Sequence, residues 1–199
     1  MKRVFDFTVS LLLILALLPV FLIIGIIIAI DAGNPVIYKQ YRVGKDNKLF
    51  YIYKFRTMKN NTRLAATKDL TEADSVITKS GKFLRKTSLD ELPQLFNVLK
   101  GDMSFVGPRP LIPEEKEIRQ LRKEYGIYAV RPGITGWAQV NGRDMLGDEE
   151  KALFDKEYID KQSIAFDIKI MIKTVMVVLK RENILEGGEP DNKYNSGNS

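Results

Sequence analysis

The sequence predicts an α+β fold that is mainly helical, in which a re-entrant membrane helix precedes a β-hairpin and further helices. Three observations carry this prediction. Residues 7–30 contain no charged side chain. Residues 35–58 form two β-branched and aromatic runs around a polar turn. Apolar residues then recur at helical spacing in later segments.

The apolar segment Phe7–Ile30 has 24 residues, which form a helix of about 36 Å and could cross a hydrocarbon core of about 30 Å. A signal peptide is disfavoured because no A-x-A cleavage site follows. Pro19 removes a helical N–H near the middle and leaves two halves of about 18 Å, each too short to span. Basic residues flank both ends and favour the cytoplasmic side. We therefore expect a re-entrant helix, with a Pro-kinked spanning helix as the alternative.

The net charge of +6 is concentrated around this segment. Residues 1–59 carry nine Lys or Arg and three Asp or Glu, whereas the remaining residues are balanced. This distribution favours anionic membrane lipid as a partner and disfavours nucleic acid, whose binders usually spread a basic face over the folded domain. The chain has no His and no Cys, which excludes Cys nucleophiles, His bases and the usual zinc sites.

The organisation of the rest follows from turn and periodicity signals. We expect a membrane helix at residues 1–30, a cytoplasmic domain at residues 31–182 and a polar tail, typical of disorder, at residues 183–199. A length of 199 residues fits one domain with attachments. Within the domain we expect a hairpin at 35–58 with its turn at 44–47, a polar loop with a short helix at 59–80, and helix at 81–100 interrupted by Pro93.

Beyond residue 100, the run 101–111 is too rich in Gly and Pro for regular structure, and residues 114–125 form a charged helix. Residues 131–143 are expected to be a turn-rich loop around one short extended run. The apolar stretch 163–181 predicts a helix. Two interpretations of that helix stay open: a core helix with snorkelling lysines, or a helix that lies on the membrane surface.

Two adjacent carboxylates, Asp90 and Glu91, stand out in the stretch Thr87–Leu95. Ser88 and Glu91 fit the S-x-x-E capping box, so the pair could simply start a helix. Chemistry is the other interpretation, because magnesium typically uses one or two carboxylates plus substrate phosphates, and an Asp carboxylate can attack phosphorus. Several cations lie nearby in sequence and could neutralise phosphate oxygens: Lys82, Arg85, Lys86, Lys100 and Arg109. Pro108 and Pro110 constrain Arg109, which favours a rigid phosphate clamp.

The long run SLDELPQLFNVLKGDMSFVGPRP at residues 88–110 resembles the signature of the bacterial sugar transferases, the monotopic polyprenyl-phosphate phosphoglycosyl transferases. Similar matches are KRVFDF at the N-terminus, YKFRTM in the hairpin and RPGITGWAQVNGR, together with Tyr158, Ser163 and Asp167. These motifs extend over nearly the whole chain. Its size resembles the minimal members of that family, which have only a catalytic core.

The resemblance implies a transferase that moves a phospho-sugar from a UDP-sugar to undecaprenyl phosphate, releases UMP and uses Mg²⁺. It places the nucleophile at Asp90, with Glu91 as a partner for metal binding or proton transfer, and both carboxylates as metal ligands. It also implies a re-entrant helix, amphipathic surface helices, a helix-associated β-hairpin and the cytoplasmic face of the bacterial inner membrane. The residues expected to bind substrate in the matching motifs are Lys54, Arg85, Pro108, Arg109, Pro110, Gln139 and Arg143.

One position departs from that family, whose members commonly have Ser-Pro at the membrane break, whereas this chain has Leu18-Pro19. A Ser hydroxyl can bond a freed carbonyl and Leu cannot. Two other classes of function remain as alternatives: a membrane-anchored adaptor without activity, and a nucleic-acid binder. The sequence leaves open the sugar, which loops around residues 59–80 and 143–150 could set, the glycan pathway, and whether the chain forms a homo-oligomer.

Overall fold

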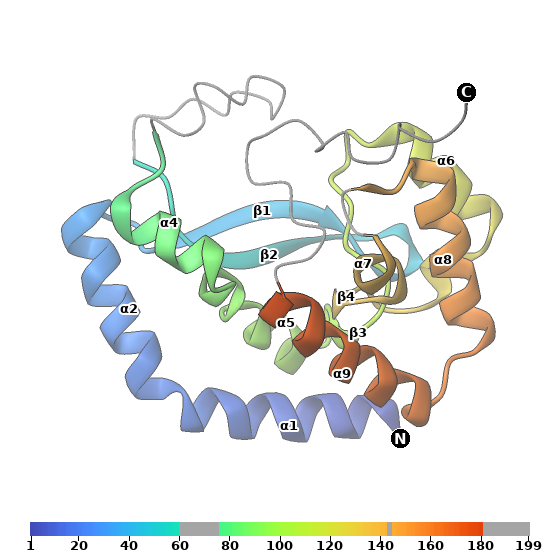
Figure 1. Ribbon diagram of the computed structural model, residues 1–199, viewed down its shortest axis with the longest axis horizontal. Helices are drawn as coiled ribbons and strands as arrows, with labels where there is room; N and C mark the ends of the chain where they lie inside the picture. The colour runs from blue at the N-terminus through green and yellow to red at the C-terminus, as the bar shows by residue number, and fades with distance from the viewer. Residues whose placement is uncertain (60–75, 143–144, 181–199) are drawn as a thin grey trace, which may run out of the picture.

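The computed structural model describes residues 1–59, 76–142 and 145–180 and shows a mainly helical protein with two small sheets of two strands each (Figure 1). The expected mainly helical α+β class is confirmed. The helices are α1 Lys2–Ala16, α2 Leu18–Asp31, α4 Lys79–Lys86, α5 Gln94–Lys100, α6 Lys116–Glu124, α7 Trp137–Asn141, α8 Asp148–Asp160 and α9 Ile164–Lys180, with 3₁₀ turns η1 Lys45–Asn47, η2 Leu89–Glu91 and η3 Ile127–Ala129. The strands are β1 Ile37–Val43, β2 Leu49–Phe55, β3 Ser104–Val106 and β4 Gly133–Thr135.

The apolar N-terminal segment is two helices that meet at a sharp bend. No single helix of the described residues is long and apolar enough to cross a membrane, but α1 and α2 together are, with a bend of 62° between them. The break lies at Leu17, so its expected position at Pro19 is wrong by two residues. Pro19 instead stands in the first turn of α2, where a helix needs no N–H from it.

Helix α1 is attached to the domain by the polar residues of its first two turns. The Arg3 guanidinium donates to the Val98 and Leu99 carbonyls at the end of α5, at 2.6 and 2.7 Å. Buried Asp6 accepts from the Phe105 N–H at 3.3 Å, and Lys2 pairs with Asp167 of α9. Figure 1 shows the start of α1 beside α9 and the rest of α1 along the lower edge. The polar residues of the KRVFDF motif therefore attach the start of α1 to the rest of the domain.

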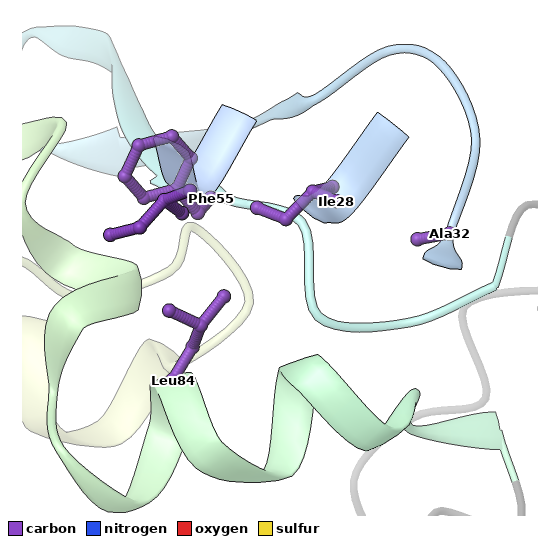
Figure 2. Packing of buried hydrophobic residues seen from close by; sticks show 5 residues of the cluster. Ile28, Ala32, Phe55 and Leu84 are labelled. Atoms are coloured by element: carbon purple, nitrogen blue, oxygen red, sulfur yellow. The ribbon is translucent and has the colours of Figure 1, made fainter. Parts of the chain in front are cut away.

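Helix α2 is attached by apolar packing. Ile28 and Ala32 lie with Phe55 of the hairpin and Leu84 of α4 in one buried cluster, which Figure 2 shows from close by. The far end of α2 is tied to the start of α4, because the Ser80 N–H and hydroxyl both donate to Asp31. The hairpin and α4 thus form the surface against which α2 is set.

The predicted hairpin is confirmed. Strands β1 and β2 pair antiparallel from Ile37↔Phe55 to Val43↔Leu49, and the turn lies where the polar residues 44–47 predicted it. The outer edge of β2 is covered by Asn97 of α5, whose amide accepts from the Tyr53 N–H at 3.0 Å and donates to the Tyr51 carbonyl at 2.6 Å. This buried amide satisfies backbone groups that an edge strand would otherwise leave open.

The segment 81–100 is interrupted as predicted: α4 ends at Lys86, and α5 begins at Gln94, directly after Pro93. The predicted capping box is wrong. Ser88 has a left-handed backbone with φ 56° and makes no side-chain cap bond, and the Glu91 carboxylate binds Lys54 of β2. A tertiary ion pair has replaced the local hydrogen bond that the sequence pattern indicated.

The expectation of irregular structure at 101–111 is wrong for Ser104–Val106, which pair in parallel with β4. The short extended run predicted inside 131–143 is confirmed as β4. A Cβ on Gly133 would lie 2.1 Å from the Gly107 nitrogen, so glycine is required where these two segments run side by side. Because the partners are far apart in sequence, local composition could not indicate the pairing.

Two helices were not expected where the structure has them: α7 within the loop predicted at 131–143, and α8, which begins at Asp148 inside the expected loop 143–150. The helix predicted at 163–181 is confirmed as α9. Its inner face carries buried Ile170, and Lys173 donates to Asn141 and stacks on Trp137, so this lysine faces the domain. The short helix expected within 59–80 falls largely, and the polar tail falls wholly, outside the described residues.

Candidate active site

A pocket opens where the hairpin, the η2 turn and the loop after β3 meet. It is lined by Arg42, Ile52, Lys54, Glu91, Gln94, Arg109, Pro110, Gly133 and Ile134. Four of the predicted site residues (Lys54, Glu91, Arg109 and Pro110) are thereby brought together from three separate segments. Asp90 directly precedes Glu91 on η2 and is not part of this lining as the structure describes it.

The acidic side of the site is built by a tight local turn. The left-handed backbone of Ser88 turns the chain out of α4, and Pro93 ends the η2 turn before α5 begins. The two carboxylates have different surroundings. Glu91 forms an ion pair of 2.6 Å with Lys54, whereas burial raises the pKa of the Asp90 carboxyl to about 6, which Lys54 opposes and Glu91 reinforces. A carboxylate whose pKa is shifted by desolvation and by a neighbouring cation is typical of functional sites.

The cationic side is built by long-range contacts to the loop Gly107–Leu111. The Arg122 guanidinium of α6 donates to the Arg109 carbonyl at 2.6 Å and forms a buried ion pair with Asp155 of α8. The Arg42 guanidinium of β1 donates to the Pro110 carbonyl at 3.2 Å. The backbone of the loop at Arg109 is therefore held from both sides, and Arg109 is one of the residues that line the pocket.

Three further predicted residues, Arg85, Pro108 and Gln139, lie near the pocket without lining it. Arg85 donates to the Thr57 hydroxyl at 3.0 Å and is close enough to oppose the raised pKa of Asp90. Pro108 is buried, and its carbonyl accepts from Gly133, which lines the pocket. Gln139 of α7 donates to the Ile134 carbonyl, also at the lining, at 3.2 Å. Arg143 lies outside the described residues.

Five residues of the lining were missed by sequence reasoning, and two of them, Arg42 and Gln94, have polar side chains. Gln94 is buried one turn after Glu91, so its proximity to the carboxylates was a usable signal. Arg42 had no local signal, because its position depends on the hairpin meeting the loop after β3. The backbone joins these two segments as well, through Val43 N–H to Leu111 carbonyl at 2.9 Å.

Comparisons with known proteins identify the family of this chain. A family model described as bacterial sugar transferase matches residues 1–181. The chain is 41% identical over 184 residues to an uncharacterized sugar transferase, EpsL, of Bacillus subtilis (strain 168), covering 92% of this chain and 90% of that protein.

Two longer relatives have more specific names. The chain is 44% identical over 182 residues to the UDP-glucose:undecaprenyl-phosphate glucose-1-phosphate transferase of Escherichia coli (strain K12), covering 88% of this chain and 39% of the relative. It is 41% identical over 197 residues to the undecaprenyl-phosphate galactose phosphotransferase of Salmonella typhimurium, covering 92% and 41%. The chain thus spans about two fifths of these two relatives. Because the family model covers nearly all of it, this chain belongs to the bacterial sugar transferase family.

Proposed function

We propose that this chain transfers a phospho-sugar from a UDP-sugar to undecaprenyl phosphate and releases UMP, which would begin assembly of a glycoconjugate or exopolysaccharide. The observation that carries the proposal is the pocket that joins the carboxylate turn at Glu91 to the cations Lys54 and Arg109. Anionic phosphates need such cations, and a carboxylate beside them can act on phosphorus. The names of the E. coli and Salmonella relatives support the same substrate classes.

In the proposed first step, an oxygen of the ionised Asp90 carboxylate attacks the phosphorus that carries the sugar. A bond forms between this oxygen and phosphorus, and the bond from phosphorus to the UMP oxygen breaks, with its electron pair leaving on UMP. The result is an acyl phosphate that links Asp90 to the sugar. Desolvation supports this role, because it removes water that would stabilise the carboxylate before reaction.

In the second step, a phosphate oxygen of undecaprenyl phosphate attacks the same phosphorus, and the Asp90 carboxylate leaves with the electron pair of its bond. The product is the diphosphate-linked sugar, and Asp90 is restored. In this proposal Lys54, which pairs with Glu91, offsets negative charge at the two carboxylates in both steps, and Arg109, which lines the same pocket, binds phosphate oxygens.

Magnesium fits this site only together with substrate. No group of three or more His, Cys, Asp or Glu side chains is arranged for a metal among residues 1–59, 76–142 and 145–180. Asp90 and Glu91 supply two carboxylates, which matches the way Mg²⁺ uses one or two carboxylates and completes its shell with phosphates and water. Held there, the ion would neutralise charge on the diphosphate as UMP leaves.

We further propose that α1 and α2 form a re-entrant insertion at the cytoplasmic face of a bacterial inner membrane. Both helices and one face of α9 expose apolar side chains that water would not favour. The most exposed are Val4, Leu12 and Leu15 on α1, Leu22, Ile26 and Ile30 on α2, and Ile172 and Val175 on α9. The bend of 62° and the basic residues at both ends support entry and exit on one side.

A UMP-release assay tests the proposed reaction. The purified full-length chain is incubated with undecaprenyl phosphate, Mg²⁺ and, in turn, UDP-glucose, UDP-galactose and UDP-N-acetylgalactosamine. We expect UMP and a lipid-linked sugar from at least one donor. Absence of UMP from the whole panel, with the chain folded and lipid present, would instead support the adaptor without activity.

Thiol labelling tests the re-entrant insertion, because the chain has no native Cys. A single Cys is introduced as Lys2→Cys or, after α2, as Asn34→Cys. We expect both to react with an impermeant reagent only after the cells are opened. Labelling of Lys2→Cys in intact spheroplasts, with Asn34→Cys still protected, would show a spanning helix.

A further inference from the structure

Arg42 stands near the end of β1 and brings a second guanidinium to the pocket that contains Arg109. Two of its nitrogens have partners: one donates to the Pro110 carbonyl at 3.2 Å, and another to the Gln40 amide oxygen at 2.9 Å. Its third nitrogen, Nε, is buried and has no hydrogen-bond partner among the described residues. A buried donor without a hydrogen-bond partner lowers stability unless a ligand accepts its hydrogen bond.

The guanidinium groups of Arg42 and Arg109 also repel each other. Burial, followed by the positive charge of Arg109, lowers the pKa of Arg42, while Glu115 and Glu91 act in the other direction. Glu91 is already in an ion pair with Lys54, so its negative charge does not compensate Arg42 alone. Two like charges held at one pocket destabilise the empty site, and a dianionic ligand between them would remove that repulsion.

We infer that Arg42 is a phosphate-binding residue of this site and that its guanidinium, with that of Arg109, binds the diphosphate of the UDP-sugar. This inference rests on the proposed function for the identity of the ligand. Its chemistry is that of guanidinium groups in general, which bind phosphate oxygens in a bidentate manner. It also gives the hairpin a role in the reaction, because β1 carries Arg42 and β2 carries Lys54 into the same pocket.

The competing explanation is that Arg42 only fastens the loop through the Pro110 carbonyl. Arg119 of α6 provides a matched control, because it makes a similar bond to the Pro113 carbonyl at 2.6 Å, carries the same charge and also has a buried Nε without a partner among the described residues. What sets Arg42 apart is its position beside Arg109 in the candidate active site. Arg119 lines a different pocket, with Lys116, Lys123 and Tyr128. Loss of a loop fastening and of one positive charge is therefore common to both variants, whereas loss of a phosphate contact is specific to Arg42.

The test compares ligands with and without phosphate, by isothermal titration calorimetry on the full-length chain. The ligands are UDP, uridine and inorganic pyrophosphate, and the variants are Arg42→Gln and Arg119→Gln. We expect Arg42→Gln to weaken UDP and pyrophosphate binding about ten- to a hundredfold and to leave uridine binding within about twofold. Arg119→Gln should leave all three affinities near those of the wild-type chain.

An equal loss of affinity for UDP and uridine would overturn the inference and make Arg42 a positioning residue. Unchanged UDP and pyrophosphate affinities in Arg42→Gln would also overturn it. The proposed function fails in a different way. A wild-type chain that binds pyrophosphate through Arg42 but releases no UMP from any UDP-sugar would sustain the phosphate site and refute the transferase reaction.

Discussion

The acidic and cationic sides of the pocket are positioned by different means. The acidic side, Asp90 and Glu91, depends mainly on a few neighbouring residues, namely a left-handed Ser88, a single 3₁₀ turn and the break at Pro93, with one tertiary ion pair from Glu91 to Lys54. The cationic side depends on distant segments, because the loop with Arg109 is held by Arg42 from the hairpin and by Arg122 from α6. One side is set by local backbone geometry and the other by tertiary structure.

This difference predicts how each side responds to mutation. A change at the acidic side is expected to alter the charge of the proposed reacting group and to leave the rest of the fold in place. A change in the contacts behind Arg109 exposes a buried charge or loosens a loop, so it alters stability and substrate binding together. The following predictions separate these two kinds of effect.

The largest effect is expected for Asp155→Asn, which removes the partner of buried Arg122. An uncompensated buried charge costs about 3–5 kcal/mol of stability. The same change should weaken the use of UDP-sugar, because Arg122 also holds the Arg109 carbonyl. Urea unfolding and kcat/KM for the UDP-sugar measure the two effects.

Asp160→Asn is the matched control, since Asp160 lies on the same helix and pairs with Lys156 in an exposed i,i+4 arrangement. Such pairs contribute about 0.3–0.5 kcal/mol. Equal, small losses of stability in both variants would show that the pair behind Arg109 does not hold the cationic side.

A smaller effect is expected for Arg109→Lys, which keeps the positive charge but loses the bidentate fork. We expect kcat/KM for the UDP-sugar to fall about ten- to a hundredfold, as for loss of a charge-assisted hydrogen bond. Stability should change little, because the backbone carbonyl that Arg122 binds is retained. Lys116→Ala, at an exposed residue of the neighbouring helix, should have a negligible effect. If the two variants lose activity equally, Arg109 is a surface residue.

The smallest effect is a pH dependence set at the acidic side. Burial raises the pKa of Asp90 from 3.8 to about 6, so the carboxyl gains its proton as the pH falls through 6. The ionised nucleophile is then lost, and kcat/KM for the UDP-sugar should fall about tenfold between pH 7 and pH 5. Lys54→Gln should move the profile to higher pH, because Lys54 lowers the pKa of Asp90. A profile that stays flat to pH 5 would contradict the assignment.

The extent to which the sequence predicted the site follows the same division. Asp90, Glu91 and the interruption at Pro93 could be predicted because they are close together in the chain. The hairpin was predicted because its two strands are joined by a short turn, which makes the pairing local. Arg109 was expected near the carboxylates because it follows them closely in sequence, and it lines the same pocket as Glu91, but the contacts that hold its loop were not predicted.

Three of the failures are long-range, whereas the helices α7 and α8 and the bend at Leu17 were missed locally. The Ser88–Glu91 capping box is wrong because Glu91 binds Lys54 on a strand that is distant in sequence. Strand β3 was missed because its partner is β4, and Arg42 was missed because it meets Pro110 only in the folded chain. Local propensity gives way wherever such a tertiary partner offers a better hydrogen bond or ion pair.

Mass spectrometry of a trapped intermediate can show whether Asp90 forms a covalent bond to phosphorus. The full-length chain is incubated with its UDP-sugar without undecaprenyl phosphate, so that the second step cannot occur. We predict a phospho-sugar adduct on the peptide that contains Asp90, with one UMP released per chain, and neither in a folded Asp90→Asn variant. An adduct on another peptide, or near-normal turnover by Asp90→Asn, would contradict the account.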